Sequence, residues 1–183
     1  MSDVVRFAEL FEKRNRLAPD DFVIYGGTFD PIHSGHVTVL RSLLTLFQSC
    51  ILAPASSNPW KPVPPTDLDL RIAMIELVLK AESLPTTDTP EGTGIFIVGE
   101  GYVYSEDLVA RLRDLRRGAI YWAVGEDGAA SVRQWRNWEQ LDITAVVLPV
   151  IDPVHATDIR LGLAPVHHAL LGFCRKHGLY GLT

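Results

Sequence analysis

Cysteine and long apolar runs are both scarce in this sequence, and their scarcity excludes several classes of protein. The 183 residues hold only two cysteines, Cys50 and Cys174, too few and too distant for a disulfide framework or a Cys-x-x-Cys metal site. A reducing, cytoplasmic compartment is therefore expected. No stretch approaches the roughly 20 apolar residues of a membrane-spanning helix. Residues 1–10 mix both signs of charge, unlike a secretory signal, so no membrane partner is expected.

A large excess of either charge is also missing. Seventeen basic and twenty-two acidic side chains give a net charge of −5, which argues against a general nucleic-acid binder. Apolar residues make up 47% of the chain and charged residues 21%, as in ordinary globular proteins. We expect a helical extension over residues 1–20, with helical apolar spacing between residues 3 and 17, and one domain over residues 21–183. The sequence is compatible with a homo-oligomer.

Short apolar runs alternate with helical patterns along the rest of the chain. Strands are predicted over residues 22–25, 50–53, 95–98, 119–124 and 144–148. Helices are predicted over residues 34–47, 67–82, 104–117, 131–141 and 166–177. This order predicts a Rossmann-like α/β fold, a doubly wound sheet of five parallel strands. Ligands bind outside the carboxyl ends of such strands, and we therefore look for the site there.

The segment Gly26–His36, with the sequence GGTFDPIHSGH, directly follows the first predicted strand. Its paired glycines let the backbone turn tightly and approach a ligand. The amides of the following helix, near Ser34–His36, favour an anion at this position. His33 and His36 are three residues apart, so both imidazoles can face one side of the first turn and donate to phosphate oxygens. A helix cap or a packed ring is the alternative, and no third ligand at suitable spacing supports zinc.

Two aromatic and acidic positions follow the fourth predicted strand. Gly125 and Asp127 stand at its end, where a carboxylate can accept hydrogen bonds from ribose hydroxyls. The indole of Trp135 offers a stacking face for a flat ring. Trp138 lies three residues further on, at the spacing of a helical core position, and we assign it to the core.

A second phosphate-binding candidate precedes the last predicted helix. Thr157 can cap a helix start with its hydroxyl, and Arg160 falls on the same side of that turn. Together they offer a hydroxyl, free amides and a guanidinium fork to a phosphate tail. Taken alone, the same residues are more typical of a capped turn with a surface arginine.

The string GTFDPIHSGH over Gly27–His36 resembles the GxFDPxHxGH signature of the nucleotidyltransferase superfamily, and more narrowly of bacterial nicotinate-nucleotide adenylyltransferases. The Gly-x-Asp strand end, the Trp-x-x-Trp segment and the Thr-x-Ile-Arg run also resemble that family. The resemblance implies that ATP is bound by Gly26, Gly27, Thr28, Phe29, His33, His36, Gly125, Asp127, Thr157 and Arg160. It implies that His33, His36 and Arg160 are catalytic, with His36 at the reacting α-phosphate. It places Lys61, Tyr102 and Trp135 at the acceptor.

The resemblance further implies the reaction. ATP would transfer its adenylyl group to nicotinate mononucleotide, giving deamido-NAD and pyrophosphate, with Mg²⁺ held mainly by the ATP phosphates. Trp60, His155 and Ala156 stand where the family has other residues. Two alternatives therefore stay open: a related transferase using nicotinamide mononucleotide or phosphopantetheine, and a sensor that binds nucleotide without catalysis.

Overall fold

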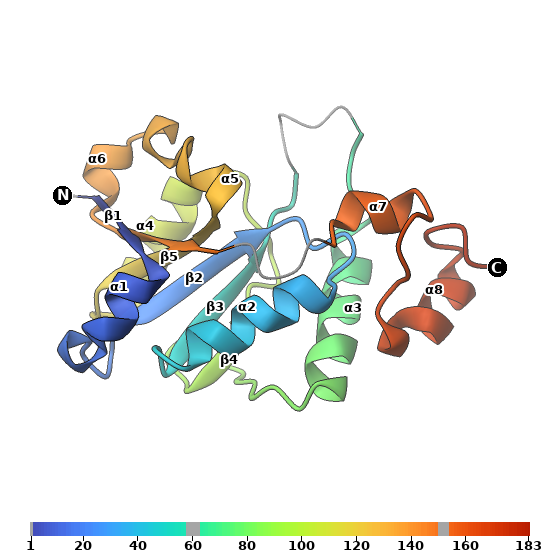
Figure 1. Ribbon diagram of the computed structural model, residues 1–183, viewed down its shortest axis with the longest axis horizontal. Coiled ribbons are helices and arrows are strands. Elements are labelled where there is room, and N and C mark those ends of the chain that lie inside the picture. Colours follow the sequence, from blue (N-terminus) through green and yellow to red (C-terminus); the bar gives the residue numbers. More distant parts are fainter. Residues whose placement is uncertain (1, 58–62, 150–153) are drawn as a thin grey trace.

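The computed structural model describes residues 2–57, 63–149 and 154–183, apart from the side chain of Asp127 (Figure 1). Six parallel strands form one sheet in the order β1-β6-β5-β2-β3-β4. The strands are β1 (Asp3–Arg6), β2 (Phe22–Gly27), β3 (Ser49–Pro54), β4 (Gly94–Ile97), β5 (Ile120–Gly125) and β6 (Thr144–Leu148). The predicted α/β class and parallel sheet are confirmed, and the five predicted strands correspond to β2–β6.

The sixth strand corrects the prediction of a helix over residues 3–17. Asp3–Arg6 pair in register with Thr144–Val147 of β6, and the helix α1 covers only Phe7–Glu12. Val4 and Val5 are β-branched and suit an extended backbone. Pairing also covers the backbone groups of β6, which would otherwise form an open sheet edge. The first residues of the chain therefore extend the sheet.

Helices cover both faces of the sheet and bury two apolar clusters. The remaining α-helices are α2 (Ser34–Leu44), α3 (Leu68–Ala81), α4 (Ser105–Leu115), α5 (Glu126–Ala129), α6 (Trp138–Leu141), α7 (Ala156–Arg160) and α8 (Leu171–His177). The 3₁₀ turns are η1 (Arg14–Arg16), η2 (Val132–Gln134) and η3 (His168–Leu170). Apolar residues of α2, α3 and α8 pack on one face with Val23, and those of α4 and α6 on the other with Phe22 and Ile24. No helix among the described residues is long and apolar enough to cross a membrane.

Two predicted helices are interrupted. The helix predicted over 131–141 is split into η2 and α6, because Trp135 is extended and Asn137 adopts a left-handed backbone with φ of 56°. The helix predicted over 166–177 begins as η3 and continues as α8. Figure 1 shows α7 and α8 beside α3 at one end of the molecule, with β1 at the other end.

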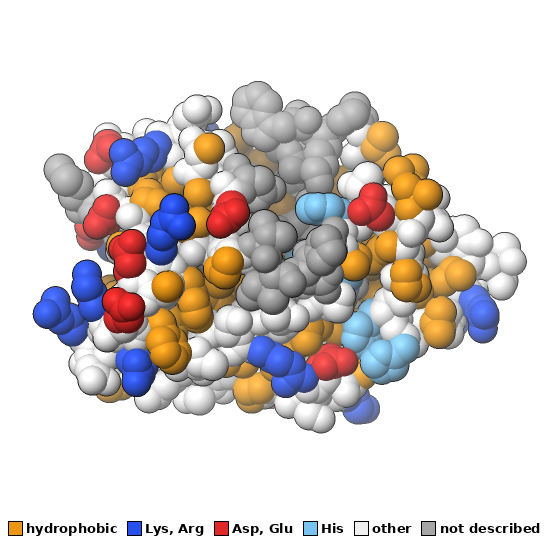
Figure 2. All heavy atoms as spheres, viewed as in Figure 1, with side chains coloured by type: hydrophobic (Ala, Val, Ile, Leu, Met, Phe, Trp, Pro, Cys, Tyr) orange, Lys and Arg blue, Asp and Glu red, His pale blue; other side chains and the backbone are white. Residues whose placement is uncertain are grey.

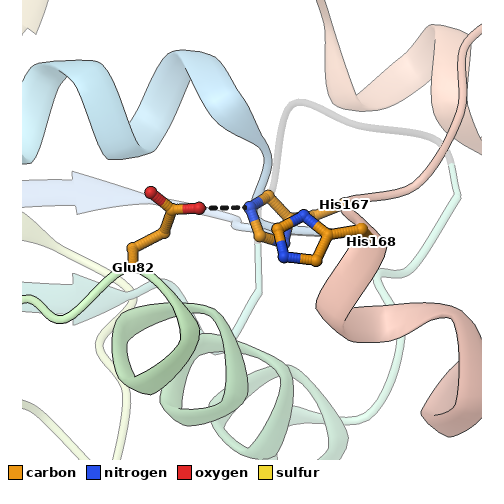
Figure 3. A group of neighbouring side chains, drawn as sticks. All are labelled: Glu82, His167 and His168. Carbon is orange, nitrogen blue, oxygen red and sulfur yellow. Dashed lines mark hydrogen bonds and ion pairs between the residues drawn. The ribbon is translucent and has the colours of Figure 1, made fainter.

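A polar cluster, the C-terminal latch (Arg41, Glu82 and His167), ties the segment before η3 to the end of α3. Figure 3 shows Glu82 and His167 together with His168. His167 Nε2 lies 3.1 Å from Glu82 Oε1, and Arg41 donates to Glu82 Oε2 at 2.9 Å. The Arg41 hydrogen bond, with a smaller contribution from His167, lowers the pKa of Glu82. His167 Nδ1 accepts the Ala169 N–H at 3.3 Å, so the proton of the neutral ring lies on Nε2 and is donated to Glu82. Protein partners thus engage both carboxylate oxygens and both ring nitrogens, and a metal ion beside His168 would have to displace them.

Basic and acidic side chains are interspersed on the face shown in Figure 2, without a continuous patch of one sign among the described residues. This mixture agrees with the small net charge of −5. Both cysteines are free and buried, as expected without a disulfide framework.

Candidate functional site

The candidate site begins where β2 ends, at two glycines: Gly26 has no room for a side chain, and Gly27 has little. A Cβ on Gly26 would collide with the hydroxyl of Tyr102 and lie 2.9 Å from the ring of Trp122. A Cβ on Gly27 would lie 3.1 Å from the ring of Phe29. These close approaches explain the glycine pair and bring the segment after β4 directly against the carboxyl end of β2.

The two histidines form the first turn of α2 and contact each other. Their ring centroids are 3.8 Å apart, so the predicted convergence of the two imidazoles is present. His33 is the N-cap: its side chain accepts hydrogen bonds from the helix amides, including Gly35 N–H at 3.2 Å. In return, the His33 N–H donates to His36 Nδ1 at 3.2 Å. The expectation of open amides at this helix start is therefore wrong for Gly35 and His36, because His33 already occupies their N–H groups.

These hydrogen bonds determine which tautomer the neutral ring of each histidine adopts. Each Nδ1 is an acceptor, so the proton of each neutral ring lies on Nε2, the group that can donate to a ligand oxygen. Burial, and secondarily the neighbouring His33, lower the pKa of His36 well below its usual value. At neutral pH His36 is therefore an uncharged donor. It can polarise a phosphate oxygen, but it cannot neutralise a phosphate as a cation.

Phe29 supports the histidine pair from within the core. Its ring is only 2% exposed and lies edge-on to His36, with a centroid distance of 4.9 Å. Its φ of 50° turns the backbone back on itself before Asp30. The direct ATP contact implied for Phe29 is therefore not provided by its side chain, which instead fixes the ring of His36.

The second motif packs onto the first. Arg160 at the end of α7 donates through Nη1 to the carbonyl of Asp30 at 2.5 Å, and through Nη2 to Thr157 Oγ1 at 2.9 Å. Both acceptors are uncharged, and no carboxylate among the described residues forms an ion pair with this guanidinium within 4 Å. The arrangement leaves a positive charge available to a ligand anion.

Three residues that carry this arrangement were not assigned from the sequence: Asp30, Arg71 and Tyr180. The Asp30 carboxylate is 3% exposed and accepts from the Tyr180 hydroxyl at 2.7 Å and from the Thr66 N–H at 3.1 Å. Arg71 is completely buried and donates to the carbonyls of Thr28 at 2.6 Å, Ala55 at 2.9 Å and Thr66 at 2.7 Å. A charged residue inside an otherwise apolar helix pattern was the available signal for Arg71.

Asp30 and Tyr180 line a cavity of about 660 Å³, here called the phosphate cavity because the predicted phosphate-binding residues Thr157 and Arg160 also line it. Its lining includes Thr28 and Asp30 from the first motif and Thr157 and Arg160 from the second. Residues 63–66 and 178–181 complete the wall. A separate cavity of about 710 Å³ lies beside α3 and β4 and contains none of the predicted site residues.

Tyr102 and Trp135, the aromatic residues predicted to lie at the acceptor, belong to one aromatic region. The Tyr102 ring lies edge-on to Trp122 at 6.0 Å, and Trp122 lies edge-on to Trp135 at 5.2 Å. Trp135 lines a cavity of about 370 Å³ together with residues 103–106, Gln134 and Arg136. Burial raises the pKa of Tyr102, which is therefore a neutral phenol. Trp138 is 5% exposed, so its assignment to the core is confirmed.

The remaining predicted site residues are Gly125, Asp127 and Lys61. Gly125 ends β5 and is the N-cap of α5, at the sheet edge where ligands were expected. Asp127 lies in α5, but its side chain is outside the described residues. Lys61 also lies outside them. The contacts assigned to Asp127 and Lys61 stay predictions.

Sequence comparisons agree with the motifs. The cytidylyltransferase-like family model matches residues 24–159. A probable nicotinate-nucleotide adenylyltransferase of Solibacter usitatus is 31% identical over 142 residues, which cover 74% of this chain and 72% of the relative. Another, from Acidithiobacillus ferrooxidans, is 34% identical over 134 residues, covering 70% of this chain and 59% of the relative. The chain thus spans less than two thirds of the second relative's length.

Solved structures share the fold at low sequence identity. A Plasmodium falciparum nicotinic acid mononucleotide adenylyltransferase complexed with NaAD has a TM-score of 0.68 at 15% identity, covering 90% of this chain and 98% of that chain. A putative nicotinate-nucleotide adenylyltransferase of Vibrio parahaemolyticus has a TM-score of 0.64 at 19% identity, covering 79% and 86%. These likenesses show the fold, whereas the family model and the sequence identities above lead to one assignment. The chain belongs to the nicotinate-nucleotide adenylyltransferases of the cytidylyltransferase-like family.

Proposed function

We propose that this protein transfers the adenylyl group of ATP to nicotinate mononucleotide, forming deamido-NAD and releasing pyrophosphate. The contact between Arg160 and the Asp30 carbonyl carries the proposal, because it joins the two phosphate-binding motifs around one cavity. The relatives described above and the solved P. falciparum and V. parahaemolyticus proteins are named after this activity.

The chemistry needs positioning and charge stabilisation more than proton transfer. A phosphate oxygen of the mononucleotide attacks the α-phosphorus of ATP in line, the bond to the β-phosphate bridging oxygen breaks, and pyrophosphate leaves. The nucleophile is already an oxyanion, so the reaction needs no strong general base. His36, an uncharged donor, is suited to the oxygen on which charge grows in the transition state. Arg160 is suited to the departing pyrophosphate, because its charge is retained at the phosphate cavity.

The donor substrate is expected to be the magnesium complex of ATP. Asp30 is the only carboxylate in the described lining of the phosphate cavity, and both its oxygens already accept hydrogen bonds. This donor set fits a magnesium ion that keeps its water and is held through the ATP phosphates. The ion supplies charge neutralisation on the triphosphate.

The aromatic region supports a pyridine ring as the acceptor's recognition element. Trp135 is partly exposed in its cavity and its ring is held in place by edge contacts with Trp122 and Trp138. An indole held in this way offers a flat, apolar face for a heteroaromatic ring. The proposal includes a cytoplasmic location, which the two free cysteines support.

Pyrophosphate release on mixing ATP and magnesium with each acceptor tests the proposal. Nicotinate mononucleotide, nicotinamide mononucleotide and phosphopantetheine are compared at equal concentration, with calorimetric ATP binding measured in parallel. The expected result is release that is fastest with nicotinate mononucleotide. Faster release with another acceptor reassigns the substrate, and ATP binding without any release makes the protein a nucleotide sensor.

A further inference from the structure

The end of the chain forms one wall of the phosphate cavity in a strained conformation. Tyr180 has a left-handed backbone with φ of 55°, between Gly178 at 60° and Gly181 at 70°. A bulky residue is strained in this region, because its Cβ lies too close to the following carbonyl oxygen. Its contacts must offset that strain, and they show what the turn achieves.

The strained turn delivers a hydroxyl to the buried carboxylate of Asp30. Tyr180 Oη donates to Asp30 Oδ1 at 2.7 Å and lies 3.7 Å from Met74 Sδ. Burial raises the pKa of Tyr180, so the phenol stays protonated and remains a donor. Residue 30 is thus joined directly to a residue 150 positions away in the chain.

Asp30 is held at three points, and one of them is the phosphate-binding arginine. Tyr180 holds one carboxylate oxygen, the Thr66 N–H holds the other, and the main-chain carbonyl accepts from Arg160. The orientation of the carbonyl that receives Arg160 therefore depends on the anchoring of the side chain of the same residue. Phe29 precedes Asp30 and has a left-handed backbone with φ of 50°. Because this conformation is strained, the contacts of Asp30 are needed to hold the peptide in place.

We infer that Tyr180 is a positioning residue for ATP binding: its hydroxyl anchors Asp30 so that the Asp30 carbonyl holds the Arg160 guanidinium toward the phosphate cavity. This role rests on the proposed function, because it assigns the cavity to the ATP phosphates. It extends that function to the C-terminal turn, which lies far in sequence from His33 and His36. The C-terminal turn then affects ATP affinity through Arg160.

The surrounding contacts make this role separable from folding. Arg71 still ties Thr28 to Thr66 when the Tyr180 hydroxyl is removed, so the loops around Asp30 keep an independent connection. Tyr180→Phe retains the ring and its apolar packing. It loses the contacts of the hydroxyl, among them the hydrogen bond to the Asp30 carboxylate on which the inference depends.

A double-mutant cycle on ATP affinity provides the test. Magnesium-ATP binding is measured by calorimetry for the wild type, Tyr180→Phe, Arg160→Ala and the double variant. Loss of a hydrogen bond to a charged group predicts about tenfold weaker ATP binding for Tyr180→Phe. In the Arg160→Ala background the same substitution is expected to change ATP binding less than about twofold, because the group being positioned is absent. The KM for nicotinate mononucleotide is expected to stay constant.

The matched control removes a hydroxyl from another partly buried tyrosine. Tyr121 in β5 packs against Phe47, away from the phosphate cavity lining, so Tyr121→Phe is expected to bind ATP as the wild type does. Equal losses of ATP affinity with and without Arg160, or wild-type affinity in Tyr180→Phe, would overturn the inference. Wild-type protein that shows the predicted coupling but releases no pyrophosphate contradicts only the proposed reaction. Absence of ATP binding in the wild type overturns both.

Discussion

Replacing Arg71 with methionine tests how the polar network beneath the phosphate cavity is balanced. Two opposing effects act on a buried guanidinium. Burial lowers the pKa of Arg71, so the charge itself is costly to keep in the interior, and an apolar side chain removes that cost. Against this, the substitution strips a hydrogen-bond donor from the carbonyls of Thr28, Ala55 and Thr66.

The geometry decides the expected sign of the change. The three hydrogen bonds are between 2.6 and 2.9 Å long, and methionine offers these carbonyls no replacement donor. At about 1 kcal/mol for each bond, the loss is about 3 kcal/mol of the free energy of unfolding. The carboxylates of Asp30 and Asp67 also raise the pKa of Arg71, so part of its desolvation cost is already offset. We therefore expect Arg71→Met to be destabilised by about 3 kcal/mol.

Urea denaturation followed by tryptophan fluorescence measures the free energy of unfolding of Arg71→Met. Arg71→Lys is the matched control: it keeps the charge but lacks the planar fork, so it is expected to fall between the wild type and Arg71→Met. Stability of Arg71→Met equal to or above that of the wild type would refute this reasoning. It would mean that the cost of burying the charge exceeds the value of the three carbonyl contacts.

The other predictions concern the site and the C-terminal latch. His36→Ala is expected to reduce kcat on the order of 100-fold with little change in melting temperature, and near-normal turnover would remove His36 from the reaction. Gly26→Ala is expected to lower both the melting temperature and activity, because its Cβ meets the Tyr102 hydroxyl; an unchanged melting curve would contradict that clash. Glu82→Gln is expected to lower stability at neutral pH. Because Arg41 lowers the pKa of Glu82 in the folded state, the wild type's advantage should disappear as pH falls through that lowered pKa. Thermal melts of both proteins across acid pH measure this, and a difference independent of pH would contradict it.

The parts of the fold that sequence patterns predicted are those fixed by local periodicity. Apolar runs such as Ile51–Ala53 are buried on both faces in the sheet and are recognisable without tertiary information. Residues 3–6 were assigned wrongly because their apolar spacing also fits a helix, and only the open edge of β6 decides between the two. The helix predicted over 131–141 failed for a similar reason. Trp135 and Trp138 have helical spacing, but the left-handed Asn137 lies between them.

In the candidate site, too, local spacing predicted some contacts, whereas contacts between distant segments were missed. His33 and His36 converge because they are neighbours on one helical turn, so their spacing was enough to predict it. That His33 occupies the helix amides depends on a side-chain rotation that spacing does not specify. The contacts of Asp30 with Arg160 and Tyr180 join positions 130 and 150 residues apart, and no local pattern records them.

Asp30 and Arg160 bring opposite charges to the phosphate cavity, and the main-chain carbonyl of Asp30 connects the two residues. A carboxylate beside a phosphate cavity would repel the substrate if it faced the cavity with open oxygens. Here the Tyr180 hydroxyl and the Thr66 N–H each donate to one oxygen of the Asp30 carboxylate. The carboxylate also raises the pKa of the buried Arg71, so the two charges attract each other. These donors and Arg71 thus stabilise the negative charge of Asp30. The neutral carbonyl of the same residue holds Arg160 without cancelling the positive charge of the guanidinium. An asparagine at residue 30 could accept from the Thr66 N–H and donate to the Tyr180 hydroxyl, but it lacks the negative charge that stabilises the buried Arg71.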